Sequence, residues 1–112
     1  MHALDILGDP VRRRLVELLA QGEKTAGELT DAARAEFGIS QPAVSNHLRV
    51  LRDAGFARSL PDGSRRIYAL RAERLTEAQE WVDEQLRFWT GTLDALETEL
   101  RRGARSTRKE ES

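Results

Sequence analysis

The most restrictive feature of this sequence is a pair of predicted helices separated by a very short link. A capping box opens the first helix, because Thr25 can accept from the N–H of Glu28 while Glu28 reaches back, and the helix should run to about Phe37. Gly38 breaks it, and Ser40 is a good N-cap for the next helix, which we place at 40–54. Two helices joined this tightly must pack against each other, as in a helix–turn–helix.

A hairpin follows the second helix directly. Two short runs, 56–60 and 64–70, flank Pro61-Asp62-Gly63, where proline presets a turn and glycine supplies a positive φ. A helix pair followed by a basic hairpin predicts a mainly α fold with a β-hairpin wing, a winged helix–turn–helix. In that arrangement the first helix braces the second, and the second presents a polar face to the major groove of double-stranded DNA.

The second helix has the two faces that this role requires. Val44, Leu48 and Leu51 recur at helical spacing and should dock inward, and no acidic residue lies between 40 and 52. Glutamine and asparagine can pair with adenine, and arginine with guanine, so the outer face suits base edges. The alternative interpretation is that the residues of this outer face are ordinary polar side chains exposed to solvent. The predicted DNA-binding residues are Ser40, Gln41, Pro42, Ser45, Asn46, His47, Arg49, Arg58, Arg65 and Arg66.

Some of these residues leave a choice open. His47 can contact phosphate or pack beside the inner leucines as a half-buried ring, and it can do both. Arg65 and Arg66 lie where a wing would meet the DNA backbone or the minor groove, with Arg58 on the facing strand. A basic strand edge also resists sheet aggregation, so the arginines can serve both purposes. The three consecutive arginines at 12–14 can contact phosphate or form a solvated helix face.

Charge changes sign along the chain although the formal net charge is only −1. The segment 40–71 carries six arginines and two aspartates, a net +4, whereas 72–100 carries eight acidic side chains and two arginines, a net −6. The first segment can approach phosphate, and the second would be repelled by it. Ordinary solvent-exposed faces would give the same totals, so charge alone does not distinguish a phosphate-binding segment from a solvated surface.

The segment 72–100 predicts one long amphipathic helix of roughly 42 Å. Its apolar stripe is longer than a domain of this size can cover, which indicates a second chain, although one more core helix is the alternative. A two-fold dimer would place two reading helices roughly 34 Å apart, the span of one DNA turn. The predicted dimer-interface residues are Leu4, Leu7, Leu75, Trp81, Val82, Phe88, Trp89, Leu93 and Leu96. We expect one domain over 1–100 and a polar, disordered tail over 101–112.

Several function classes have little support. The chain has no cysteine, which excludes disulfides and thiolate metal sites. Its only histidines are His2 and His47, and Ser45 and His47 point to different faces of one helix, so no nucleophile–base pair exists and we expect no enzyme and no cofactor. No apolar stretch approaches a membrane span and no secretory signal is present, so we expect a cytoplasmic protein without membrane contact.

Three runs resemble the ArsR/SmtB family of bacterial winged-helix repressors. They are Leu7-Gly8-Asp9-Pro10-Val11-Arg12-Arg13, Ile39-Ser40-Gln41-Pro42-Ala43-Val44-Ser45-Asn46-His47-Leu48 and Leu51-Arg52-Asp53-Ala54-Gly55-Phe56. The later Arg65-Arg66-Ile67-Tyr68-Ala69-Leu70 is similar to the family's wing. The resemblance, which covers about 3–100, implies a homodimer joined by its terminal helices, repression by binding an inverted-repeat operator, and release by an effector.

Two departures from the family pattern narrow the class. Metal-sensing members carry Cys-x-Cys in the helix that here contains Gly27-Glu28-Leu29-Thr30, and others carry histidine ligands in the last helix, which here has none. We therefore expect no metal, and carboxylates alone suit a transition metal poorly. The bracing helix is also about one turn longer than is usual in the family.

Two alternatives complete the sequence-based interpretation. The aromatic last helix resembles non-metal members, so an unidentified small-molecule effector at the dimer seam is the alternative to a plain packed interface. A protein-interaction adaptor or antitoxin-like module is the rival function. It would be expected to carry apolar or acidic residues on the outer face of 40–52.

Overall fold

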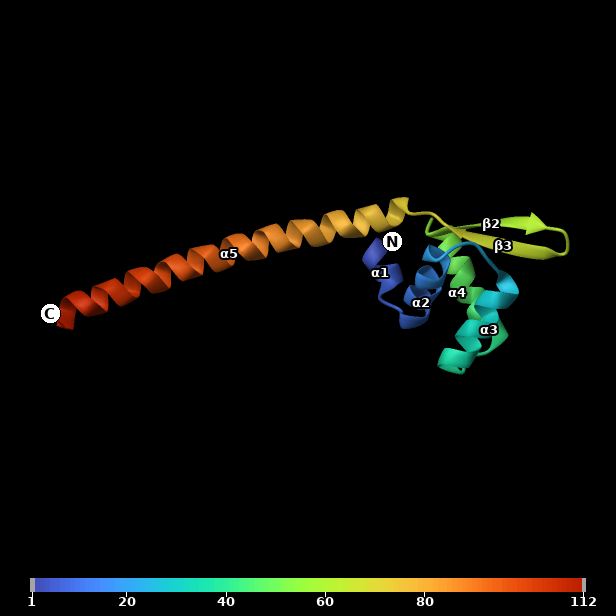
Figure 1. The fold of residues 1–112 in the computed structure, drawn as a ribbon, viewed down its shortest axis with the longest axis horizontal. Coiled ribbons are helices and arrows are strands. Elements are labelled where there is room, and N and C mark those ends of the chain that lie inside the picture. Colours follow the sequence, from blue (N-terminus) through green and yellow to red (C-terminus); the bar gives the residue numbers. More distant parts are fainter. Residues whose placement is uncertain (1, 112) are drawn as a thin grey trace. The chain divides into compact units, whose positions relative to one another are not determined.

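The computed structural model describes residues 2–111, and the side chains of residues 2–103. The fold is mainly helical with one small antiparallel sheet, which confirms the predicted winged helix–turn–helix (Figure 1). The elements in chain order are α1 (Ala3–Leu7), α2 (Pro10–Ala20), β1 (Lys24–Thr25), α3 (Ala26–Phe37), α4 (Gln41–Asp53), β2 (Ala57–Asp62), β3 (Arg65–Leu70) and α5 (Glu73–Glu111). The chain divides into two compact units after Ala78.

Local hydrogen bonds begin the helices where the sequence predicts. Asp9 accepts from the N–H groups of Val11 and Arg12 at the start of α2. The predicted capping box is present at the start of α3, and the Ser40 hydroxyl accepts from the Ala43 N–H at the start of α4. Caps of this kind satisfy N–H groups that have no partner within the helix.

The first unit has one core, built from helices and the base of the sheet. Its largest fully buried side chains are Phe56, Ile6, Leu15, Leu29, Leu51 and Val44. The spacing of Leu29, Ala32, Ala33 and Phe37 predicts an inner stripe on α3, and this prediction is wrong for one member. Phe37 ends α3 with 37% of its surface exposed, whereas Leu29 and Ala33 are buried. Each four-residue step advances about 40° around a helix, so Phe37 has turned about 80° away from Leu29.

The sheet has one strand that the sequence pattern did not reveal. Residues 24–25 form β1, which pairs with Ile67 and Tyr68 and places β3 at the centre, in the order β1-β3-β2. The hairpin turn is also tighter than predicted, because Pro61 and Asp62 extend β2 and pair with Arg66 and Arg65. Since β2 is an edge strand, it tolerates a proline that cannot donate to a ladder.

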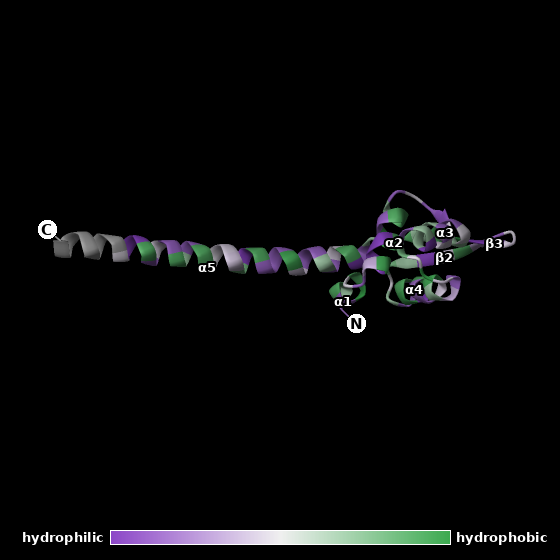
Figure 2. Ribbon diagram, turned by 90° about the horizontal axis from the view of Figure 1, so that it is seen from below, coloured by the Kyte–Doolittle hydropathy of each residue, from purple (hydrophilic) through white to green (hydrophobic). Residues whose placement is uncertain are grey.

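The last helix begins within one residue of its predicted start and extends beyond its predicted end. Its backbone stays helical to Glu111, through the segment in which we expected a disordered tail. The side chains from residue 104 on lie outside the described residues, so the domain–tail division stays a prediction. Apolar and polar bands alternate along α5 (Figure 2). None of the described helices combines the length and the hydropathy that crossing a membrane requires.

Candidate nucleic-acid interface

Helix α4 separates an apolar face from a polar one, as the sequence predicts. Val44, Leu48 and Leu51 are buried in the core, with at most 3% of their surface exposed. The opposite face is open, and its exposed polar side chains are Gln41, Ser45, Asn46 and Arg49. Burial of one face holds the helix in place, and the other face is left free to meet a ligand.

Two of these exposed side chains are already paired. The Arg49 guanidinium donates a hydrogen bond of 2.5 Å to the amide oxygen of Asn46, one turn earlier on α4. Spacing of three residues places the two side chains on the same face. The outer face therefore presents Asn46 and Arg49 as one hydrogen-bonded unit.

Gln41 and Ser45 lie along a groove that separates α4 from α3. The groove has a volume of 260 Å³, and α3 contributes Thr30 and Arg34 to its lining. A neighbouring hollow of 370 Å³ lies where the start of α3 faces the hairpin tip, and Arg65 and Arg66 line it. Both hollows include Ala26 and Gly27, so the start of α3 lies between α4 and the wing.

His47 packs at the inner edge of α4. Its ring is half-buried, and its Nδ1 is buried with no hydrogen-bond partner among the described residues. The pKa of the Asp9 carboxyl lies below its ordinary value. Burial, the strongest single influence, acts to raise this pKa, but the N–H bonds from Arg12 and Val11 and the charges of His47 and Arg12 together outweigh that effect. This placement favours the packed interpretation of His47, and its contact with phosphate stays a prediction.

The wing arginines do not share one environment. Arg66 donates to the Ser59 hydroxyl at 3.0 Å, whereas Arg65 forms a 3.0 Å ion pair with Asp62. Because side chains alternate along a strand, Arg66 lies on the face of Tyr68, which is buried, and Arg65 lies on the opposite face.

Arg58 occupies a different part of the hairpin. It pairs across the ladder with Ala69, near the base of the wing and away from the tip. There it lines a hollow together with Arg71 and Glu73. The structure therefore does not bring Arg58 together with Arg65 and Arg66.

The arginine triplet of α2 contacts protein. Arg12 and Arg13 donate to the backbone carbonyls of Ile6 and Leu7 at the end of α1, at 2.8 and 3.3 Å. Arg14 pairs with Glu36 on α3, which raises the pKa of its guanidinium, and also with Glu17. These side chains hold helices together. The pattern of charges alone could not show this, since their partners are carbonyls and a distant glutamate.

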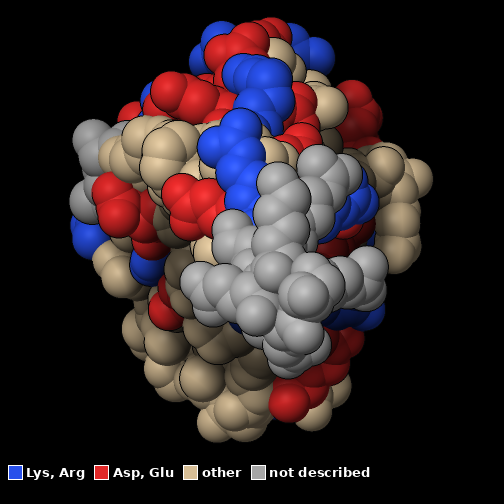
Figure 3. Space-filling view, turned by 90° about the vertical axis from the view of Figure 1, so that its left-hand side faces the viewer, with Lys and Arg blue, Asp and Glu red and all other residues tan. Residues whose placement is uncertain are grey.

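The predicted dimer-interface residues fall into two groups. Leu4, Leu7 and Leu75 are partly buried against the core of the first unit. The α5 members are exposed in the single chain, and they are Trp81, Val82, Phe88, Trp89, Leu93 and Leu96. Figure 3 shows acidic and basic side chains intermixed on the face that it presents.

Comparison with known proteins agrees with this geometry. A family model described as "Bacterial regulatory protein, arsR family" matches residues 9–59. An HTH-type transcriptional regulator of Mycobacterium tuberculosis is 40% identical over 92 residues, which are 82% of this chain and 79% of the relative. The chain belongs to the ArsR family of bacterial regulatory proteins. This family consists of transcriptional regulators and is not a family of enzymes, as the sequence predicts.

Solved structures extend the match beyond the residues of the family model. A crystal structure of an ArsR family transcriptional regulator superposes with a TM-score of 0.67 at 30% identity, covering 79% of this chain and 87% of that one. The transcriptional repressor BigR from Xylella fastidiosa superposes with a TM-score of 0.54 at 36% identity, covering 64% and 70%. The wing and the start of α5 therefore also belong to the shared fold.

The donor set of this ArsR-family chain does not fit a thiolate metal site. It has no cysteine, and α3 carries Gly27 and Glu28 where metal-sensing members are expected to carry thiols. Within the described residues, no group of three or more His, Asp or Glu side chains could hold a metal ion.

Proposed function

We propose that this ArsR-family chain is a homodimeric repressor that reads an inverted-repeat operator in double-stranded DNA through the outer face of α4. One observation carries the proposal. The exposed face of α4 presents the hydrogen-bonded Asn46–Arg49 pair beside Gln41 and Ser45, with no acidic side chain before Asp53. Arginine suits guanine and the amides suit adenine, so this face has the chemistry of base readout.

The apolar seam of α5 supports the homodimer. Leu86, Trp89, Leu93, Leu96 and Leu100 recur at alternating steps of three and four, and each leaves at least 44% of its surface exposed. A stripe of this length on a single chain is typical of a helix that pairs with another. A second copy of α5 covers it most simply, because identical stripes are complementary to each other.

Charge along α5 supports the same partner. Residues 73–84 carry five acidic side chains and one arginine, whereas residues 101–109 carry five basic side chains and no acidic one. Two copies of α5 lying side by side in opposite directions would bring unlike charges together. A parallel arrangement would bring like charges together, which costs stability.

The rival function, an adaptor that binds protein, has less support. An adaptor would need an apolar or acidic docking face, and the described outer face of α4 offers neither. We infer a cytoplasmic location, because repression of a bacterial promoter takes place there. We also infer that any effector is a small molecule held at the α5 seam, since the metal donors are absent.

A mobility-shift titration tests the proposal. The full chain is titrated against a duplex from upstream of its own coding region and against a scrambled duplex of equal length. We expect a shift of the upstream duplex that weakens as salt rises, because arginine–phosphate contacts release counterions. A folded, dimeric protein that shifts neither duplex at low salt would contradict the proposal.

A further inference from the structure

Arg34, which lies outside the reading helix and the wing, has no structural task of its own. It lies in the last turn of α3 and is exposed. Among the described residues, no hydrogen bond or ion pair involves its guanidinium. Other arginines of the first unit do have partners: Arg14 pairs with Glu36, and Arg66 donates to Ser59.

The position of Arg34 beside the reading helix is fixed by the backbone. The carbonyl of Arg34 accepts from the Gly38 N–H at 3.0 Å, and Gly38 turns the chain at φ 65°. Two residues later Ser40 caps α4. Because this link is short and hydrogen-bonded, Arg34 stays beside the first turn of α4.

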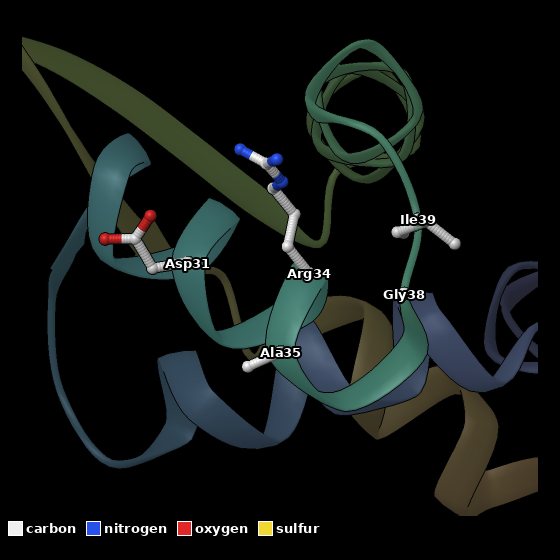
Figure 4. Close-up of a pocket in the computed structure, with 5 residues that line it drawn as sticks. All are labelled: Asp31, Arg34, Ala35, Gly38 and Ile39. Atoms are coloured by element: carbon white, nitrogen blue, oxygen red, sulfur yellow. The ribbon is translucent and has the colours of Figure 1, made fainter.

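The Arg34 side chain lies on the side of α3 that faces the start of α4. Figure 4 shows Arg34 extending from α3 toward the space beside α4, on the side of Asp31 and away from Ala35. It lines the 260 Å³ groove together with Gln41 and Ser45, the residues at the start of the reading face. It also lines an adjoining hollow of 390 Å³ with Gly38 and Ile39. Asp31 shares both hollows, and no ion pair joins it to Arg34.

We propose that Arg34 is a DNA-backbone contact, in which its guanidinium binds a phosphate at the edge of the major groove that α4 enters. This inference rests on the proposed function. A helix in the major groove is flanked by a phosphate strand on each side. The wing arginines lie beside the start of α3, and Arg34 lies near the end of the same helix. The two sites therefore hold the reading helix between separate phosphates. Guanidinium suits phosphate because it can donate two parallel hydrogen bonds.

A phosphate contact and a base contact give different results on two duplexes. Wild-type, Arg34→Ala and Arg34→Lys chains are titrated with the upstream duplex and the scrambled duplex over a salt series. Arg87→Ala, an exposed arginine of α5, is the charge-matched control. Thermal melting of each variant checks the fold, and we expect no change for Arg34→Ala because the side chain is exposed and makes no contact.

For Arg34→Ala we expect about tenfold weaker binding to both duplexes at equal salt, and a slope of log K against log salt reduced by about 0.9. Arg34→Lys should restore the slope, and Arg87→Ala should match wild type. Unchanged affinity and slope, a loss confined to the upstream duplex, or a slope that lysine does not restore would each overturn the assignment of Arg34 alone. Failure of the wild-type chain to bind either duplex would overturn the proposed function and this inference with it.

Discussion

The guanidinium of Arg49 is hydrogen-bonded to the amide oxygen of Asn46, and both side chains lie on the exposed face of α4. This bond uses one of the two lone pairs of the Asn46 amide oxygen and leaves its NH₂ group free to donate. It also leaves donors of Arg49 free for a guanine edge. In the proposed DNA complex this pair is arranged in advance, so less conformational entropy would be lost on binding.

We predict that Arg49→Ala removes base discrimination at one position, a loss of about 1–3 kcal/mol in specific binding. Asn46→Ala should give part of the same loss, because it releases the Arg49 side chain. The double variant should therefore cost less than the sum of the two. Binding-site selection and titration of all three variants measure this. Strictly additive losses would show that the two side chains act separately.

Arg52→Ala is the matched control for that experiment. Arg52 lies on the same helix and is exposed, but it faces Asp53 at 3.8 Å near the end of α4. We expect its removal to leave the selected sequence unchanged. A changed motif would mean that the reading face extends further along α4 than Arg49.

The wing arginines should differ in their effect on affinity. Arg66 is bonded to a neutral hydroxyl and keeps its full charge, whereas Arg65 is partly neutralised by Asp62. We predict that Arg66→Ala weakens binding to every sequence and reduces the salt slope by about 0.9, with a smaller effect for Arg65→Ala. Titrations over a salt series measure both. The prediction fails if Arg66→Ala changes the selected motif.

The cap of α2 should make part of the stability depend on pH. The pKa of Asp9 is lowered from 3.8 in the folded chain, so its ionised form is stabilised by folding. This contribution is present above 3.8 and is lost as the pH falls through the lower, folded value. Asp9→Ala should therefore cost about 1 kcal/mol at pH 7 and less at pH 3. Urea unfolding at both pH values tests this, and an equal cost at both would argue against it.

The seam of α5 can be tested without disturbing the core. We predict that Leu93→Glu converts the dimer to a monomer, because it buries a charge between two helices. Arg87→Glu introduces the same residue about 120° away around the helix and should leave the dimer intact. Sedimentation velocity measures the outcome. The buried core cluster ends at Ala78, so both variants should keep the melting behaviour of the first unit. A dimeric Leu93→Glu chain would place the interface elsewhere.

Much of the fold follows from neighbours along the chain. The caps at Asp9, Thr25 and Ser40 and the inner face of α4 formed as predicted, because each depends on contacts two to four residues apart. The two-residue strand β1 has no such signature. It exists only because Tyr68 and Ile67 offer a free edge to a segment more than forty residues earlier.

By itself, the sequence determined the helix–turn–helix, the wing and the polar outer face of α4, because periodicity and capping are local properties. Tertiary structure alone decided which arginines remain available. Arg12 and Arg13 are held by backbone carbonyls of α1 and Arg14 by the distant Glu36, whereas Arg34 is left open beside α4. A charge in the sequence has no partner until packing brings one within hydrogen-bonding distance, and for this reason its role is settled only in three dimensions.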